Sequence, residues 1–285
     1  MFKNILSKIQ FKNLAIRFYI DFFMPSRLPL YEELLITALN QGYQTCSIIS
    51  FWRLIIDKQI DPTRKYLILR HDIDSDIKTA IAFWELEKKL GVQSSFYFRL
   101  STLDIPLMQK IEQSGSEASY HYEEIATVAK ERGLRTQRQI QQNLMDIQMR
   151  FKTNYHMIKH KSGLRMATVA SHGDFVNRKL SLPNHYLLES KLLRDELQIE
   201  LETYDLVMMQ YVTSRHSDTQ SLNMWQPNHP LQAIMHGEKV VYILTHPRQW
   251  HVSWIENLKD NLQRVWEGLH YSLFCRLNEW LCQQK

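Results

Sequence analysis

Two carboxylates stand two residues apart in the segment Arg70-His71-Asp72-Ile73-Asp74. The residues before it, Tyr66 to Leu69, form a short apolar run that predicts a buried strand. Side chains at positions i and i+2 of an extended chain lie on one side, so Asp72 and Asp74 approach the same point. Their repulsion is unfavourable unless a shared proton or a bound cation offsets it. The segment therefore indicates a divalent metal site, with one aspartate as ligand and the other taking a proton from water.

Three histidines, His121, His172 and His246, stand at the ends of later predicted strands. In parallel α/β folds, ligands and catalytic groups gather at the carboxyl ends of strands. We therefore expect one of the two aspartates, together with His121 and His172, to bind a metal ion and to leave one coordination position open for water. The other aspartate would accept a proton from that water, and His246 would protonate the leaving group. Zinc suits these ligands best, with cobalt, nickel and iron as alternatives.

A purely structural reading of the same residues stays open. A chain with twelve histidines places some of them near strand ends by chance. Asp72 and Asp74 are also good N-cap residues for the helix that follows, although Ser75 and Asp76 are nearer its start. The alignment of several candidates at successive strand ends favours the functional reading.

The elements that must position these residues follow from hydrophobic periodicity. From residue 66 onward, short apolar runs alternate with helical periods, which indicates βαβ units and a mostly parallel sheet or barrel. The predicted strands cover residues 66–69, 93–100, 117–122, 166–171, 204–212 and 240–245. The predicted helices cover 75–90, 105–113 and 134–151, and a long final helix has Trp254, Leu258, Leu262, Val265, Trp266 and Leu269 in period.

Composition and charge limit the classes of function. The 285 residues are 44% hydrophobic and 23% charged, which is ordinary for a globular protein. The net charge of +5 is scattered and therefore disfavours nucleic acid, although it suits an anionic glycan, a phosphate-bearing lipid carrier or a membrane surface. The three cysteines form no Cys-x-x-Cys pair, so we expect neither disulfides nor a cysteine zinc site, and a reducing, cytoplasmic location.

The chain contains no run of about 18 apolar residues that would span a membrane. Its first 25 residues mix apolar side chains with Lys3, Lys8, Lys12 and Arg17 and show no signal-peptide pattern. We expect an ordinary helix packed on the domain. A basic amphipathic helix in peripheral contact with a membrane is the alternative.

Several segments, in order, resemble the polysaccharide deacetylase superfamily, within the branch whose first motif reads His-Asp-Val-Asp and which accompanies surface-polysaccharide synthesis. The segments are Leu69–Asp74, Gly91–Phe98, Gly115–Glu123, Ala170–Gly173, Ser217-Asp218 with Trp225, and Leu244–Pro247 with Trp250. The likeness spans roughly residues 65 to 250. In the third segment, Ser116 and Ser119 replace a histidine and a glycine of the family pattern.

The resemblance implies a deformed (β/α) barrel of about seven parallel strands in a single domain. Residues 1–60 would form an N-terminal helical extension packing on the barrel, and residues 61–285 would form the barrel and a long C-terminal helix. The activity implied is metal-dependent hydrolysis of an acetamido group on a carbohydrate or a lipid-linked sugar.

Carried over by position, Asp72 is the general base, Asp74 and His121 are metal ligands, and His246 is the general acid. The family's second histidine ligand stands four residues after the first, where this chain has Ile125. We therefore expect His172 to be the third ligand. For substrate binding, the resemblance indicates Asp218 and Trp225, and the aromatic character of Tyr122 and Trp225 suits stacking on sugar rings.

Three other functions are compatible with parts of this pattern. Ile125 favours a non-catalytic barrel that binds a glycan or scaffolds its synthesis. The same metal site also suits hydrolysis of a non-sugar amide, such as a cyclic ureide. His71-Asp72 suggests an HD-type phosphohydrolase, but those sites are built on helices and this segment follows a predicted strand. The sequence does not specify the sugar, the metal or the oligomeric state.

Overall fold

The central strand of the protein is β2 (Lys65–Ile73), which grows out of the predicted apolar run. On one edge it pairs with β9 (Val240–Thr245). On the other edge it pairs with β1 (Tyr43–Cys46) along its first half and with β3 (Ser95–Phe98) along its second half. All three pairings are parallel, and β2 continues through residue 73, so most of the two-aspartate motif belongs to the strand itself. The computed structural model describes residues 15–283, with side chains for residues 15–276.

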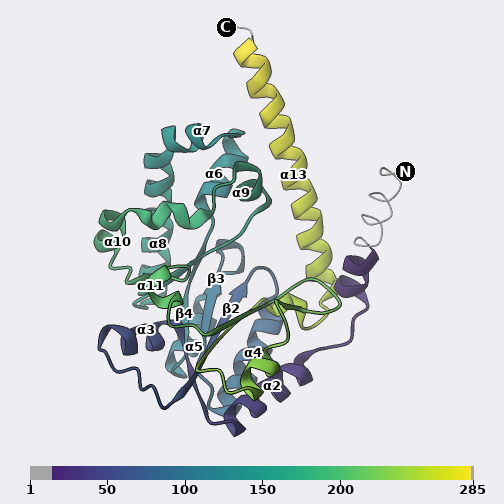
Figure 1. The fold of residues 1–285 in the computed structure, drawn as a ribbon. Helices are drawn as coiled ribbons and strands as arrows, with labels where there is room; N and C mark the ends of the chain where they lie inside the picture. Colours follow the sequence, from purple (N-terminus) through teal and green to yellow (C-terminus); the bar gives the residue numbers. More distant parts are fainter. Residues whose placement is uncertain (1–14, 284–285) are drawn as a thin grey trace.

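The sheet curls into a half-barrel with the strand order β6-β5-β4-β3-β2-β9-β7-β8, and β1 joins it beside β2 (Figure 1). Only the β7–β8 pair is antiparallel, so the predicted α/β class with a mostly parallel, deformed barrel is confirmed. Within the described residues the sheet has nine strands rather than about seven. The remaining strands are β4 (Glu117–Tyr122), β5 (Thr168–Ser171), β6 (Leu201–Glu202), β7 (Ser214–Asp218) and β8 (Trp225–Gln226).

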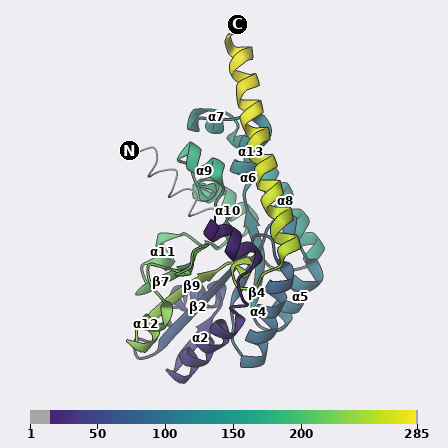
Figure 2. The same cartoon turned by 90° about the vertical axis from the view of Figure 1, so that its right-hand side faces the viewer.

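Helices surround the sheet, as the second view shows (Figure 2). The α-helices are α2 (Leu28–Asn40), α3 (Ile48–Ile56), α4 (Ile77–Leu90), α5 (Ile105–Gln113), α6 (Glu124–Arg132), α7 (Gln137–Gln142), α8 (Leu144–Ser162), α9 (Phe175–Leu180), α10 (Lys191–Leu197), α11 (Leu206–Met209), α12 (Pro230–Met235) and α13 (Trp254–Gln283). Short 3-10 turns are η1 (Leu100–Thr102), η2 (Asn184–Glu189) and η3 (Pro247–Gln249).

The helix that follows the two-aspartate motif has its own cap. Asp76 is the N-cap of α4 and accepts a hydrogen bond from the Thr79 backbone N–H at 3.0 Å. The helix ends at Gly91, whose φ of 66° is the left-handed conformation common at helix ends. Neither Asp72 nor Asp74 is therefore needed as the cap of this helix.

Two predicted elements differ from the observed ones. The predicted helix 134–151 is two helices, α7 and α8, which meet at Asn143. The predicted strand 204–212 is wrong, because its apolar run forms the single helical turn α11, and the strands of this region are β6 and β7. Leu206 and Val207 are exposed and only Met208 is buried, so the run does not have the two-sided burial of an inner strand.

The segment expected as an N-terminal helical extension contains both helices and a strand in its described part. Residues 15–22 are helical, and α2 and α3 follow, but Tyr43–Cys46 form β1 within the sheet. The extension thus contributes a strand to the barrel as well as packing on it. Most of the segment for which we expected an ordinary packed helix, or alternatively a basic amphipathic one, falls in residues 1–14, which lie outside the described residues.

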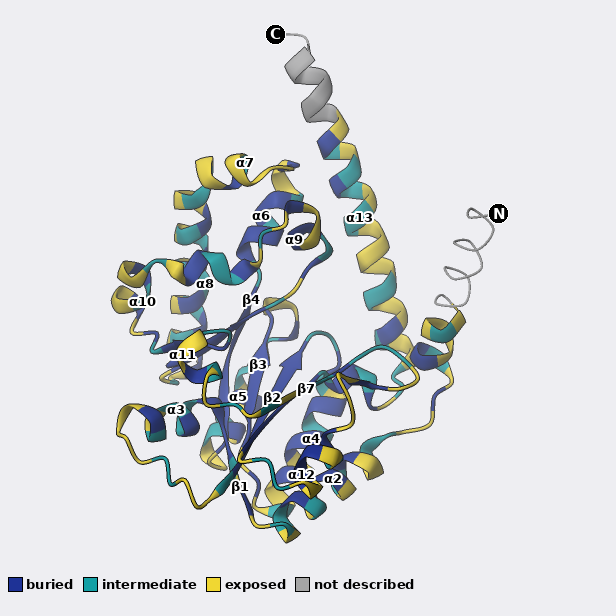
Figure 3. Cartoon of the chain, viewed as in Figure 1, coloured by how far each residue is buried: buried dark blue, intermediate teal, exposed yellow. Residues whose placement is uncertain are grey.

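The long C-terminal helix α13 forms as expected, but its apolar period faces outward (Figure 3). All six predicted periodic residues, from Trp254 to Leu269, are exposed. The side that faces the body carries Asn257, Tyr271 and Cys275, which are buried. No helix among the described residues has the length and apolar character needed to cross a membrane.

Alternation along β2 sorts its side chains between two hydrophobic layers. Leu67, Leu69 and Ile73 belong to the large cluster that the outer helices cover. Tyr66 and Ile68 belong to a second cluster, which also contains Tyr97 and Tyr242 from the neighbouring strands. Because the period of a strand is two, residues 70 and 72 fall on the side of the second cluster.

Candidate functional site

Arg70 and Asp72 form a buried pair on the inner side of β2. Arg70 Nε donates to Asp72 Oδ1 and Arg70 Nη2 donates to Asp72 Oδ2, each at 2.7 Å. The guanidinium also lies over the rings of Tyr97 and Tyr204, 5.5 and 5.0 Å from their centroids. Burial raises the pKa of Asp72, but the charge of Arg70 outweighs it and leaves the pKa below its ordinary value. Asp72 is therefore held ionised in one orientation.

His71 points the opposite way, into the layer beneath the helices. Its Nε2 lies 2.8 Å from Glu87 Oε1 on α4, and its Nδ1 lies 2.6 Å from Thr245 Oγ1 on β9. Tyr31 of α2 donates to the same Glu87 oxygen. His71 is fully buried, so it ties β2 to its neighbours and takes no part in the site.

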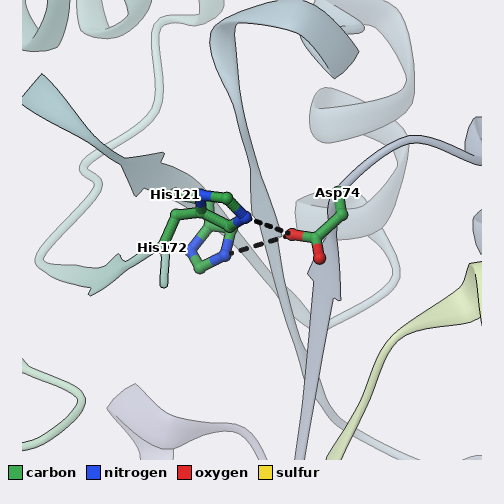
Figure 4. A group of neighbouring side chains, drawn as sticks. All are labelled: Asp74, His121 and His172. Atoms are coloured by element: carbon green, nitrogen blue, oxygen red, sulfur yellow. Dashed lines mark ion pairs between the residues drawn. The ribbon is translucent and has the colours of Figure 1, made fainter. Parts of the chain in front are cut away.

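Three of the predicted ligands meet at the carboxyl ends of their strands (Figure 4). Asp74 directly follows β2, His121 lies in β4, and His172 directly follows β5. Asp74 Oδ1 is 3.4 Å from His121 Nε2 and 3.6 Å from His172 Nε2, and the three donor atoms lie within 4.8 Å of one another. Asp72 Oδ2 lies 3.5 Å from His121 Nε2, at the edge of the same group.

This group fits a divalent cation. Asp74 Oδ1 is buried and has no hydrogen-bond partner among the described residues, although buried carboxylate oxygens are normally satisfied. His121 Nδ1 lies 3.0 Å from the Ala170 carbonyl, which assigns the proton to Nδ1 and leaves the Nε2 lone pair facing Asp74. Burial raises the pKa of Asp74, but the neighbouring His172, His121 and His246 hold it well below its ordinary value. Two imidazole nitrogens and one carboxylate are the donor set of many catalytic zinc sites.

A neighbouring acidic group is satisfied by ion pairs instead. His172 Nδ1 lies 3.2 Å from Glu123 Oε2, and Asp174 completes this second group. Arg99 binds Glu123 with its Nε and Nη2 at 3.0 and 2.7 Å, and Lys130 lies 2.9 Å from Asp174. Sequence reasoning missed Arg99 and Glu123, although each directly follows a strand (β3 and β4), the same signal that identified the ligands.

His246 is held by Asp218 across neighbouring strands. It directly follows β9, and Asp218 is the last residue of β7. Asp218 Oδ1 lies 2.6 Å from His246 Nδ1, and Asp218 Oδ2 accepts from the His246 backbone N–H at 2.7 Å and from Trp250 Nε1 at 2.8 Å. Burial lowers the pKa of His246, but the Asp218 carboxylate outweighs it and raises the pKa to about 9. Asp218 is buried behind the histidine, so it orients His246. It is therefore not placed for the substrate-binding role that the sequence had suggested.

The two aromatic residues expected to contact substrate lie in the core. Tyr122 follows His121 in β4, so it points to the other side of the sheet, where it is fully buried with its ring 5.1 Å from that of Phe151. Trp225 is 7% exposed and packs on Trp250, with ring centroids 5.6 Å apart. Neither ring offers a free face to a sugar, which corrects the substrate-binding role predicted for both.

Two cavities have His172 in their walls. One of about 480 Å³ lies beside Asp74 and His172, with walls from α9, α13 and the helical residues 15–22. The other, of about 350 Å³, is lined by His172, His185 and Tyr204. Each has the size range of a small-ligand site.

No protein-family model and no curated protein matches this chain. Among solved structures, it is similar to the Streptococcus pyogenes deacetylase PplD in complex with acetate, at 14% identity and a TM-score of 0.43, over 61% of this chain and 70% of that one. It is also similar to the Xyl-CE4 domain of a multidomain xylanase from the hindgut metagenome of Trinervitermes trinervoides, at 12% identity and a TM-score of 0.33, over 70% and 84% of the two chains. Likenesses with TM-scores below 0.5 do not assign this chain to a family.

Proposed function

We propose that this protein is a metal-dependent hydrolase that removes the acetyl group from an N-acetylated sugar in surface-polysaccharide metabolism. The observation that carries the proposal is the meeting of Asp74, His121 and His172, which come from three different strand ends. Asp72 lies at the edge of this group. His246 directly follows the neighbouring strand β9, and its pKa is raised to about 9.

Asp74 Oδ1, His121 Nε2 and His172 Nε2 would hold the metal ion, for which we propose zinc. When bound, such an ion supplies Lewis-acid polarisation of the substrate carbonyl and lowers the pKa of water. Ile125, at the position of the family's second histidine, is fully buried in the apolar core. An isoleucine side chain has no atom that can bind a metal ion. In our proposal His172 is therefore the third ligand.

Asp72 and His246 supply the proton transfers. Asp72 Oδ2, the oxygen nearer His121, would take a proton as water attacks the amide carbon. His246 Nδ1 is bound by Asp218, whereas its Nε2 has no hydrogen bond among the described residues. Nε2 would therefore give its proton to the leaving nitrogen as the C–N bond breaks. The products are acetate and a free amine.

The sugar substrate follows from the resemblance of the motifs to polysaccharide deacetylases. A carbohydrate or a lipid-linked sugar would occupy the cavities beside His172. A cytoplasmic location, with peripheral membrane contact as an alternative, remains a prediction of the sequence.

The proposal is tested by metal analysis of the purified protein and of His172→Ala and Asp74→Asn, with His160→Ala as control. His160 is exposed on α8, away from the site. We expect near-stoichiometric metal in the wild type and in His160→Ala, and loss of metal in the two site variants. Acetate release from a panel of acetylated amino sugars should follow the metal content.

Two results would contradict this assignment. Metal retained by His172→Ala would move the third ligand elsewhere. A wild-type protein that stays metal-free after reloading with zinc, cobalt or nickel would reject the hydrolase and leave the non-catalytic glycan-binding barrel.

A further inference from the structure

The cavity beside Asp74 and His172 carries both signs of charge on its walls. Its cations are Arg17, Arg99, Arg178, Lys179 and Arg264, and its carboxylates are Asp74, Asp174, Asp260 and Glu267. Most of these groups are paired with one another or with a neighbour, and the single Lys130 ammonium is shared by two carboxylates. The pairings are Lys130 with Asp174 at 2.9 Å and with Glu267 at 2.6 Å, Arg264 with Asp260 at 2.9 Å, and Arg99 with Glu123 at 2.7 Å.

Three cations of the wall have no carboxylate partner within the described part of the chain, namely Arg17, Arg178 and Lys179. The Lys179 ammonium is already engaged, because it lies over the rings of Phe175 and Tyr271 at 5.4 and 5.3 Å from their centroids. Asp74, the one carboxylate of the wall without a lysine or arginine partner, would be neutralised by the metal ion. The guanidinium groups of Arg17 and Arg178 are thus left as uncompensated positive charge.

Arg178 belongs to the walls of both cavities that His172 lines, including the one beside Asp74. Its helix, α9, is anchored by Asp174, whose Oδ1 accepts the Val176 backbone N–H at 2.8 Å. The backbone of Arg178 is therefore fixed, while its side chain is exposed and free to meet a ligand.

We propose that the substrate carries an oxyanion, a phosphate or a sugar carboxylate, which Arg178 binds with help from Arg17 beside the reacting acetamido group. This inference rests on the proposed function and narrows its substrate to an anionic acetamido sugar. A guanidinium matches both oxyanions because its planar fork donates two parallel hydrogen bonds. The wall charge that remains once the ion pairs are formed is positive, which disfavours a cationic ligand and favours an anionic one.

The first test compares kcat/KM for an acetamido sugar, its 1-phosphate and its uronic acid counterpart. Arg178→Ala and Arg178→Lys are measured beside Arg138→Ala, an exposed arginine of α7 that lines neither cavity. We expect the wild type to prefer an anionic substrate and Arg178→Ala to lose about 10- to 100-fold on it, and to lose clearly less on the neutral sugar. Arg178→Lys should recover part of the loss. The substrate that shows the loss identifies the oxyanion.

Equal use of neutral and anionic sugars by the wild type, or an equal loss on both in Arg178→Ala, would overturn the inference. If the wild type hydrolyses none of the three, the proposed function fails and binding decides the inference separately. Calorimetric titration with the acetamido sugar 1-phosphate, the uronic acid and inorganic phosphate then provides the readout. Binding that is lost in Arg178→Ala but kept in Arg138→Ala would support it, and no binding of any anion to the wild type would reject it.

Discussion

Neighbouring charges determine the protonation states of the buried acid and base of the site. Burial alone would neutralise an isolated carboxylate or imidazolium, because the low-dielectric interior disfavours the charged form. Arg70 nevertheless keeps the pKa of Asp72 below its ordinary value, and Asp218 raises the pKa of His246 to about 9. A proton acceptor and a proton donor therefore coexist at neutral pH, as acid–base catalysis requires.

At this scale we predict that Asp218→Asn lowers the pKa of His246 from about 9 toward its ordinary 6.5. A general acid must be protonated, so wild-type kcat/KM should fall as the pH rises through about 9, and the same fall should begin at lower pH in the variant. NMR titration of His246 measures the pKa without a substrate. If the pKa of His246 is the same in Asp218→Asn as in the wild type, the Asp218 carboxylate does not set that pKa.

At the scale of the element, successive side chains of β4 point to opposite faces of the sheet, so candidate metal ligands and core residues alternate along the strand. His121 and Tyr122 are adjacent in sequence, yet His121 faces Asp74 and Tyr122 packs in the large hydrophobic cluster. The same alternation on β2 sends Asp72 inward and His71 outward. A one-residue shift in either strand would exchange the two sets, so the strand register defines the site.

We therefore predict opposite effects from neighbouring substitutions on β4. His121→Ala should abolish metal binding, whereas Tyr122→Ala should cost about 3–5 kcal/mol of unfolding free energy through the cavity that it leaves. Tyr122→Phe should be close to neutral in both respects, since the hydroxyl makes only a 3.4 Å contact with Glu202. Urea unfolding and metal analysis measure the two effects. Loss of metal in Tyr122→Phe would show that our assignment of the two faces is wrong.

At the scale of the whole molecule, buried Asp21 joins segments that are far apart in the chain. Its side chain accepts from Gln220 Nε2 and Asn261 Nδ2, each at 2.9 Å, and it faces Arg248 Nη2 at 3.3 Å. Its carbonyl accepts from Asn257 Nδ2 at 2.7 Å. The helical residues 15–22 and α13 are thereby fastened together at one wall of the cavity beside Asp74.

We predict that Asp21→Ala destabilises the protein by about 2 kcal/mol, because it removes charge-assisted hydrogen bonds and weakens the pairing of buried Arg248. Asp57→Ala, at an exposed helix end, is the control and should have little effect. Urea unfolding gives the free energies, and limited proteolysis should show earlier cleavage near residues 15–27 in Asp21→Ala. Equal stability of the two variants would mean that this junction contributes little.

Much of the framework could be predicted from the sequence by itself, because hydrophobic periodicity is a local property. Strands Glu117–Tyr122 and Val240–Thr245 and helix Ile105–Gln113 have the bounds that periodicity predicts. The positions of the candidate ligands at strand ends were predicted in the same way. The run 204–212 failed, because a short apolar stretch does not distinguish an inner strand from an exposed turn of helix.

Only the tertiary structure decided which of these residues meet. Asp218 and His246 are 28 residues apart, and they are partners because β7 lies beside β9. Tyr122 and Trp225 are not part of the proposed substrate site, because burial depends on the side of the sheet that a side chain faces. Arg178 is part of it, because α9 brings Arg178 into the same cavity wall as His172. The physical reason is the same in each case. Periodicity is encoded along the chain, whereas contacts between elements depend on strand order and on how helices cover the sheet.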